Sequence, residues 1–249
     1  MATAADEAAG GAANDGAVRD LQVPAWPSPR WLKACIIRSL DGAFVGADGR
    51  SGSLSHPDDR AHLREVRALS DAVLVGAQTL RVERYRPLTV TPDVRERRIA
   101  AGLAPAPRLV IVTRSLDLPW DAPVFTDSPV PPLVVTPQAP SRPSVTSAEL
   151  IVVDTSHPGT IIDALIDRGL EHITCEGGQR LLALLEQHDL VDEIALTLAP
   201  MLVGAAPDGS AQALASPTRF TAVQVRESSG YVFTRWVRDD RLARLGITP

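Results

Sequence analysis

The sequence contains little cysteine and almost no lysine, and both shortages limit what the protein can do. Its 249 residues include two cysteines, Cys35 and Cys175, which are too few for a disulfide framework and lack the close pairs of a zinc site. We therefore expect two buried free thiols, no metal centre and a reducing, cytoplasmic environment. Because Lys33 is the single lysine, any side chain that holds a phosphate by its charge is expected to be an arginine.

Signals for nucleic acids, membranes and secretion are also missing. The net charge is −5, and no basic cluster is dense enough for a nucleic-acid surface. The longest uncharged apolar stretch, residues 194–207, is too short and too interrupted by Pro and Gly to cross a bilayer. Asp6 and Glu7 lie where a signal peptide would be apolar. We therefore expect neither nucleic acid nor membrane as a partner.

Several catalytic motifs are absent as well. The sequence has no P-loop, no G-x-S-x-G, no G-x-G-x-x-G, and no H-x-E with P-C-x-x-C. These absences argue against an NTPase, a serine hydrolase, an ordinary dehydrogenase and a zinc deaminase. The five histidines are scattered without the spacing of metal ligands.

The pattern of apolar residues predicts one α/β domain. Residues 1–27 are aperiodic and rich in Ala, Gly and Asp, so we expect a disordered tail before a single domain over residues 28–249. Helices are expected after a Ser55 cap, with Leu63, Val66 and Leu69 as the buried stripe, at 160–168 and at 180–187. Strands are expected at 31–37, 72–75, 109–113, 124–126, 133–136, 150–153, 172–175 and 194–198, and in a hairpin over 222–237.

This alternation of strands and helices indicates a mixed, mostly parallel sheet flanked by helices. The terminal hairpin predicts an antiparallel edge. Two further stretches, residues 87–107 and 137–147, are expected to be loops because of their Pro-rich composition.

In open α/β sheets, ligands bind beyond the carboxyl ends of the strands. One such end reads Glu176-Gly177-Gly178-Gln179-Arg180, where glycines at a helix start let backbone amides approach a phosphate; a tight turn with a buried glutamate is the alternative. Another reads Gly76-Ala77-Gln78-Thr79, whose threonine hydroxyl binds a phosphate or caps the next helix.

Two more strand ends carry charged side chains. Arg114 and Ser115 offer a fork of donors plus a hydroxyl, which suits the 2′-phosphate of NADPH, although an exposed arginine in a turn is common. Asp41, beside Gly42, either orients a substrate group or caps a turn. Arg67 is a candidate anion ligand unless it is solvated or ion-paired.

Four segments together resemble a known family. They read SLDG at residues 39–42, VRALSDAVLVGAQT at 66–79, RLVIVTRS at 108–115 and ITCEGGQRLLALLEQHDLVDEIALTLAPMLVG at 173–204. In order and spacing, over roughly residues 31–238, the chain is similar to the reductase domain of the bifunctional riboflavin-pathway deaminase–reductases. The ending GYVFTR at 230–235 most resembles stand-alone actinobacterial-type members.

This resemblance implies a dihydrofolate-reductase-like fold, NADPH as cofactor, a homodimer, and reduction of the ribosyl group of a diaminopyrimidinone ribosylamine phosphate to ribityl. It implies Asp41 as the catalytic residue nearest the reacting carbon, and Ser51, Arg67 and Glu176 as substrate ligands. The cofactor residues that it implies are Ile37, Ser53, Gly76, Ala77, Thr79, Arg114, Ser115, Gly177, Gly178, Gln179, Arg180 and Leu181.

The sequence departs from this family at two basic positions. Cys35 stands where the family has a lysine, and Thr91 stands where an arginine helps to hold the substrate phosphate. Arg84 or Arg86 is a candidate replacement. Two alternatives therefore stay open: an NADPH-dependent reductase of another substrate, such as dihydrofolate or another pterin, and a non-catalytic NADPH-binding protein.

Overall fold

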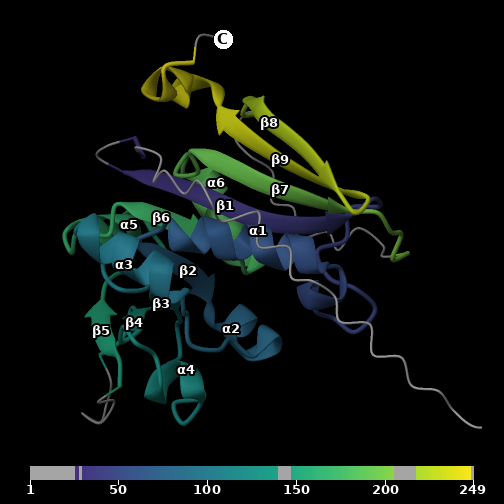
Figure 1. The fold of residues 1–249 in the computed structure, drawn as a ribbon. Coiled ribbons are helices and arrows are strands. Elements are labelled where there is room, and N and C mark those ends of the chain that lie inside the picture. The colour runs from purple at the N-terminus through teal and green to yellow at the C-terminus, as the bar shows by residue number, and fades with distance from the viewer. Residues whose placement is uncertain (1–25, 28–29, 140–146, 205–216, 248–249) are drawn as a thin grey trace, which may run out of the picture.

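The computed structural model describes residues 26–27, 30–139, 147–204 and 217–247 (Figure 1). It contains one nine-stranded sheet in the order β5-β4-β3-β2-β6-β1-β7-β9-β8. The strands are β1 Trp31–Ser39, β2 Ala72–Gly76, β3 Arg108–Val112, β4 Leu133–Thr136, β5 Glu149–Val152, β6 His172–Cys175, β7 Glu193–Ala199, β8 Phe220–Ser228 and β9 Tyr231–Arg238. The helices are α1 Pro57–Ala68, α2 Ala77–Glu83, α3 Pro92–Ala100, α4 Pro123–Thr126, α5 Pro158–Ile166 and α6 Gln179–Gln187.

The predicted mixed sheet with an antiparallel edge is confirmed. The seven strands from β5 to β7 are parallel to their neighbours, whereas β9 runs antiparallel to β7 and to β8. The four residues Ala72 to Val75 of β2 are fully buried. A central parallel strand is covered by helices on both faces, which is why this run is apolar without alternation.

Helices cover both faces of the sheet (Figure 1). On one face, α5 and α6 pack on Leu74, Val110 and Cys175. On the other, α2 and α4 pack on Val73 and Ile111. Helix α1 lies over β1 and β9, where the ring of His62 contacts that of Phe233 at 5.4 Å between centroids.

Two sequence predictions about local structure were wrong. Residues 124–126 form α4 and not a strand, since Pro123 starts a helical turn whose Val124 and Phe125 are buried. The expected loop over 87–107 contains α3, which starts after Thr91 at Pro92. This helix packs through Arg98, whose guanidinium donates to the carbonyls of Ala68 and Ser70 at 2.7 and 2.9 Å. Because α3 is anchored by an arginine that binds carbonyl groups of another segment, its sequence shows no apolar stripe from which a helix could be predicted.

The start of α1 also differs from the prediction. His56 is the N-cap, and its ring nitrogen Nδ1 accepts from the Asp58 backbone N–H at 3.3 Å. The Ser55 hydroxyl instead donates to the Asp59 carboxylate at 2.6 Å. Of the expected buried stripe, Val66 is buried and the other two positions are partly exposed. The predicted tail, apart from Trp26 and Pro27, and most of the expected 137–147 loop lie outside the described residues.

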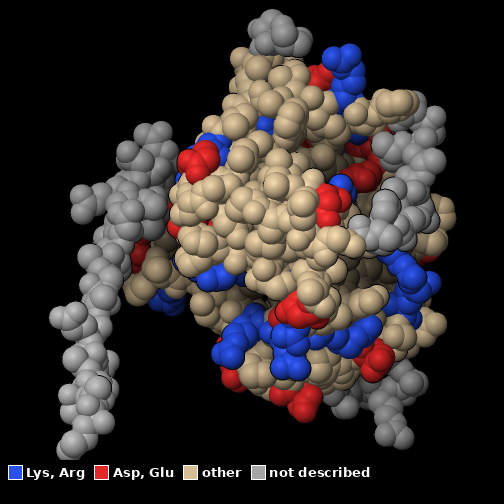
Figure 2. Space-filling view, turned by 90° about the vertical axis from the view of Figure 1, so that its right-hand side faces the viewer, with Lys and Arg blue, Asp and Glu red and all other residues tan. Residues whose placement is uncertain are grey.

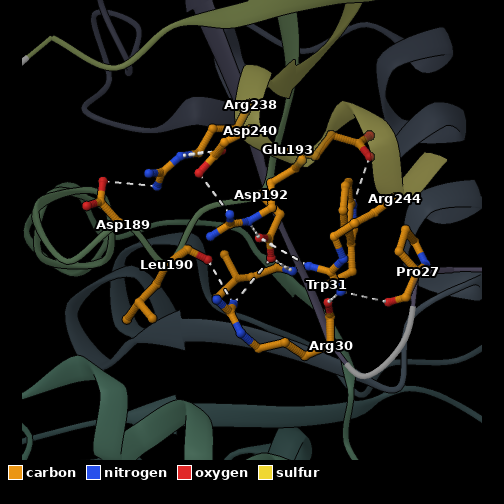
Figure 3. Close-up of polar contacts among 12 residues, drawn as sticks. Pro27, Arg30, Trp31, Asp189, Leu190, Asp192, Glu193, Arg238, Asp240 and Arg244 are labelled. Atoms are coloured by element: carbon orange, nitrogen blue, oxygen red, sulfur yellow. Dashed lines mark hydrogen bonds and ion pairs between the residues drawn. The ribbon is translucent and has the colours of Figure 1, made fainter. Parts of the chain in front are cut away.

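Two adjacent buried carboxylates at the start of β7 tie both ends of the domain together (Figure 3). Asp192 accepts from the Leu32 backbone N–H at 2.8 Å and from Arg241 at 2.9 Å. Glu193 accepts from the Trp31 indole at 3.0 Å and from Arg235 at 2.7 Å, and pairs with Lys33 at 3.1 Å. The single lysine of the chain is therefore used for structure.

Among the helices that the structure describes, none combines the length and apolar character that crossing a bilayer requires.

Candidate active site

A cavity of about 590 Å³ opens at the carboxyl ends of β1 and β6, between α1 and α2. Cys35 and Ile37 of β1 lie at its base, the segment from Phe44 to Ser55 forms one wall, and the turn between β6 and α6 forms another. Figure 2 looks onto this end of the molecule, where basic and acidic side chains gather close together.

The wall between β6 and α6 is a cradle of backbone atoms. Gly177 and Gly178 have φ angles of 108° and 59°, a region that non-glycine residues rarely adopt. The Gly76 N–H donates to the Gly177 carbonyl at 3.0 Å, so the ends of β2 and β6 are joined. A Cβ on Gly178 would lie 3.3 Å from the Thr79 hydroxyl. The first amides of α6, which starts at Gln179, have no acceptor inside the helix, so this wall suits an anion.

Next to the glycines, at the end of β6, the buried carboxylate of Glu176 is held by an arginine and a tyrosine. Glu176, whose side chain is 4% exposed, accepts from Arg67 Nε at 2.5 Å and from Arg67 Nη2 at 2.6 Å. The Tyr85 hydroxyl donates to the same carboxylate at 2.7 Å. This arrangement fixes the orientation of the carboxylate, whose Oε1 accepts one of these three hydrogen bonds and keeps one lone pair for a ligand N–H.

The two partners of Glu176 have shifted pKa values. Burial disfavours the charged form of Arg67, but the carboxylate of Glu176 outweighs burial and raises the pKa of the guanidinium above its usual value. Burial, reinforced by Glu176, also raises the pKa of Tyr85 well above that of a free phenol. The guanidinium therefore stays charged and the phenol stays neutral near pH 7.

A second carboxylate organises the opposite wall. Glu83, at the end of α2, accepts from the Ser51 backbone N–H at 2.8 Å and from the Ser51 hydroxyl at 2.9 Å. The contact joins the short 3-10 turn Ser51–Ser53 to α2. Ser51 consequently presents its hydroxyl at a fixed point of the cavity.

The Cys35 thiol also lines the cavity. Burial, with smaller effects from Glu176 and Asp59, raises its pKa to about 12. Because the thiolate is the reactive form, Cys35 is a neutral apolar contact at pH 7 and no nucleophile. Both cysteines are free, as predicted; Cys175 is buried whereas Cys35 is only partly so.

Comparison with known proteins identifies the family. The sequence model of the RibD C-terminal domain matches residues 30–233. The chain belongs to this family. A 2,5-diamino-6-ribosylamino-4(3H)-pyrimidinone 5′-phosphate reductase of Archaeoglobus fulgidus is 27% identical over 174 residues, covering 68% of this chain and 80% of the relative. The RibD protein of Mycobacterium tuberculosis is 28% identical over 166 residues, which cover 67% of this chain but only 41% of that longer protein.

Solved structures share the RibD C-terminal fold. A pyrimidine reductase-like protein of Corynebacterium diphtheriae superimposes with a TM-score of 0.74 and 26% identity, covering 84% of this chain and 92% of the other. A deaminase/reductase of Thermotoga maritima gives a TM-score of 0.69 at 20% identity, covering 84% of this chain and 56% of the other, which shows the fold alone. The predicted family and fold class are confirmed.

This RibD-type domain brings part of the expected site together. The cavity is lined by eight of the expected residues, namely Ile37, Ser51, Arg67, Thr79, Glu176, Gly177, Gly178 and Gln179. The expected residues that do not line it are Asp41, Ser53, Gly76, Ala77, Arg114, Ser115, Arg180 and Leu181. Gly76 and Ala77 support the cradle from behind, whereas Leu181 is buried in the core.

Asp41 lies in an exposed loop away from the cavity lining. Its carboxylate accepts from the Ser39 hydroxyl, from the Gly204 N–H at 2.7 Å and from the Val203 N–H at 3.1 Å. The Ser39 hydroxyl and these backbone amides lower the pKa of Asp41 to about 2. The carboxylate is thus used to tie two loops together, and a catalytic role beside the reacting carbon stays a prediction.

Arg114 and Ser115 lie one strand away from the cradle. Val112, the last residue of β3, is in register with Gly76 at the end of β2, so Arg114 follows the same edge of the sheet. The side chain is exposed, and within the described ranges it makes no hydrogen bond or ion pair. The Ser53 hydroxyl, by contrast, already has a hydrogen-bond partner, because it donates to the Asp48 carboxylate at 2.7 Å.

Sequence reasoning did not assign several side chains of the cavity wall, among them Arg60, Glu83 and Tyr85. Glu83 and Tyr85 fall in a stretch where the sequence departs from its family, so the resemblance could not assign them. The described part of the chain contains no cluster of three His, Cys, Asp or Glu side chains able to hold a metal ion.

Proposed function

We propose that this chain is an NADPH-dependent reductase that converts the ribosyl group of a diaminopyrimidinone ribosylamine 5′-phosphate to ribityl in riboflavin biosynthesis. The observation that carries the proposal is a single cavity with a glycine cradle on one wall and the Arg67–Glu176–Tyr85 cluster on another. The activity named for the Archaeoglobus fulgidus relative supports the same reaction.

The cradle fits the phosphates of a dinucleotide. Gly177, Gly178 and Thr79 would hold the pyrophosphate, because glycine leaves room for the backbone and the α6 start offers amides. Arg114 and Ser115 would hold the 2′-phosphate, since a guanidinium matches the geometry of a phosphate. The single lysine, Lys33, is already used in a buried ion pair with Glu193. When bound, the nicotinamide supplies the hydride. Ile37 would give its ring an apolar contact.

The substrate side of the cavity is built to orient a planar ring. Glu176 would accept N–H donors of the pyrimidine, and Arg67 and Tyr85 hold it at the required angle. Ser51 would add a hydroxyl contact from the opposite wall. These residues would contribute orientation, which is worth several kcal/mol of a reaction barrier when the reacting atoms are aligned. Asp41 would act from outside, by fixing the loop that follows β1.

An assay of NADPH consumption with a panel of substrates tests the proposal. The panel contains the ribosylaminopyrimidinone 5′-phosphate in its amino and deaminated forms, together with dihydrofolate. The proposal expects turnover with one of the two pyrimidines. Faster reduction of dihydrofolate would replace it with a pterin reductase, and tight NADPH binding without any turnover would replace it with a non-catalytic binding protein.

We also propose a homodimer in the cytoplasm. Family resemblance supports the dimer, and β8 gives it a surface, because this strand lies at the outer edge of the sheet and Val225 is 67% exposed. Light scattering of the purified protein tests it, with a monomer mass at micromolar concentration as the contrary result.

A further inference from the structure

A second cavity, of about 230 Å³, lies on the other side of α1 from the candidate active site. Residues of β1, β7, β8 and β9 form its floor. The α1 positions that line it are 62, 65, 66 and 69, whereas positions 59, 60, 62, 63 and 67 line the first cavity. Apart from His62, which reaches both, these two sets form different faces of the helix. Helix α1 therefore separates the two cavities.

The floor of the second cavity carries two cations on one buried carboxylate. Glu193, whose side chain is 1% exposed, pairs with Lys33 at 3.1 Å and accepts from Arg235 Nε at 2.7 Å and from Arg235 Nη2 at 3.2 Å. The Trp31 indole donates to the same carboxylate at 3.0 Å (Figure 3). Each carboxylate oxygen thus has two donors, which fill its acceptor capacity. Because one carboxylate neutralises one of the two cations, the floor keeps one positive charge in excess.

Both cations keep N–H groups for a further acceptor. Lys33 has three N–H donors and Arg235 has five. Within the described ranges, the carboxylate of Glu193 is the acceptor with which both side chains are paired. Lys33 Nζ also lies over the ring of Trp26, at 4.7 Å from its centroid. An acceptor that enters the second cavity would therefore find free donors at its floor.

The charged side chains nearer to solvent do not change this balance. The guanidinium of Arg226 lies over the Phe233 ring at 4.9 Å, and Glu65 pairs with His62 at 3.8 Å. Arg226 and Glu65 carry opposite charges, and because the first is exposed and the second partly exposed, solvent and salt screen both. The excess charge beside the buried Glu193 is screened much less. The second cavity therefore favours an anionic group at its floor.

The walls above this floor are largely apolar. Val66 and Leu69 of α1 line them, together with Phe233, Trp26 and Leu245. An apolar cavity of about 150 Å³ is large enough for benzene. The 230 Å³ of the second cavity consequently has room for one aromatic ring with a small substituent. An apolar pocket with a few polar groups at one place fixes the orientation of such a ligand.

We propose that the second cavity binds a small aromatic carboxylate, separately from the active site. The carboxylate accepts hydrogen bonds from Lys33 and Arg235, and the ring packs among the apolar side chains of the walls. Lys33 is already held by Glu193 and by the Trp26 ring, so little ordering of its side chain opposes binding. The proposal does not rest on the proposed function, because neither Lys33 nor Arg235 lines the active-site cavity.

Titration of the full-length protein with benzoate, followed by the NMR signals of the tryptophan indole N–H groups, tests the site. We expect the signals of Trp26 and Trp31 to shift, since both residues line the cavity. The signal of Trp120 should stay in place, because this ring packs on Phe125 of α4, outside the cavity.

Benzyl alcohol, which has the same ring but no charge, is the matched probe. Benzoate should bind at least tenfold more tightly than benzyl alcohol, the value of one charge-assisted contact. Because α1 separates the two cavities, added NADPH should leave the dissociation constant of benzoate unchanged.

Two substitutions test the residues that form the site. R235Q removes one cation while Lys33 still pairs with Glu193, so the variant should fold and bind benzoate about tenfold more weakly. L69W places a larger side chain in the cavity and should abolish the shifts that benzoate causes. R64Q is the matched control on α1, because Arg64 is exposed and lines neither cavity. Its affinity for benzoate should equal that of the unchanged protein.

Equal affinity for benzoate and benzyl alcohol would overturn the proposal without any variant. Unchanged affinity for benzoate in folded R235Q would also overturn it. Displacement of benzoate by NADPH would show that benzoate binds in the active-site cavity. A shift of the Trp120 signal without shifts of Trp26 and Trp31 would show that it binds elsewhere, and either result would refute the second site.

Discussion

Removing one hydroxyl from the Glu176 cluster gives a quantitative test of the site. In Y85F, the Glu176 carboxylate keeps both contacts from Arg67 but loses the 2.7 Å hydrogen bond from the phenol. A hydrogen bond to a charged group contributes about 1.5–3 kcal/mol. Because Glu176 is 4% exposed, water cannot easily take the place of the hydroxyl. We expect the free energy of unfolding in urea to fall by about 2 kcal/mol.

The other tyrosine provides a matched control. The Tyr231 hydroxyl is also buried, but it donates to a neutral acceptor, the Leu54 carbonyl, at 3.0 Å. Y231F should therefore destabilise the protein by about 1 kcal/mol, the value of a neutral hydrogen bond. Y85F should also raise the KM for the pyrimidine while leaving the dissociation constant of NADPH unchanged. The reasoning fails if Y85F is no more destabilising than Y231F and the KM stays the same.

The remaining predictions concern separate parts of the molecule. R114A should weaken the binding of NADPH by about 1.5–3 kcal/mol in direct titrations and leave the binding of NADH almost unchanged. An equal loss of affinity for both cofactors would show that Arg114 does not bind the 2′-phosphate. D41N should lower turnover more than NADPH affinity, since Asp41 holds a loop outside the cavity; a changed dissociation constant with normal turnover would contradict this. Cys35 should resist alkylation at pH 8 in the folded protein, because its pKa is raised to about 12, and rapid labelling would show that the thiol is accessible and ionised.

The stability of the protein in acid should depend on Glu193, because neighbouring cations shift the pKa of this carboxyl group. Burial alone would raise the pKa of Glu193, but Lys33 and Arg235 lower it below its usual value. Because the pKa of Glu193 is lower in the folded than in the unfolded protein, its carboxylate stabilises the fold at pH values above the usual carboxyl pKa. This stabilisation is lost as the pH falls through the folded-state pKa. In E193Q, the decrease in unfolding free energy on acidification should be shallower. An unchanged acid slope would show that the cluster does not contribute.

The sequence predicted those parts of the site that depend on backbone conformation. Paired glycines after an apolar run are typical of a tight strand-to-helix turn, so the turn at Gly177 and Gly178 could be predicted without knowledge of the fold. Glu176 and Arg67 are 109 positions apart in the chain and meet only in the folded structure. The sequence singled out each of them separately, whereas their shared role as substrate ligands was implied by the family resemblance alone.

Other parts could not be predicted because their role depends on tertiary contacts. Asp41 stands beside a glycine in a loop, and nothing local distinguishes an acid that faces a substrate from one that binds the amides of Val203 and Gly204. Helix α3 was missed because Arg98 anchors it through carbonyls of another segment. The strand assigned to residues 124–126 was a short apolar run, which fits a helical turn equally well.

The most direct test of the reductase assignment is the loss of NADPH absorbance in the presence of the ribosylaminopyrimidinone 5′-phosphate. We expect oxidation of NADPH that saturates with this substrate, that fails with its dephosphorylated form, and that slows in Y85F at substrate concentrations below saturation. Saturating concentrations of both ligands without any loss of absorbance would contradict it.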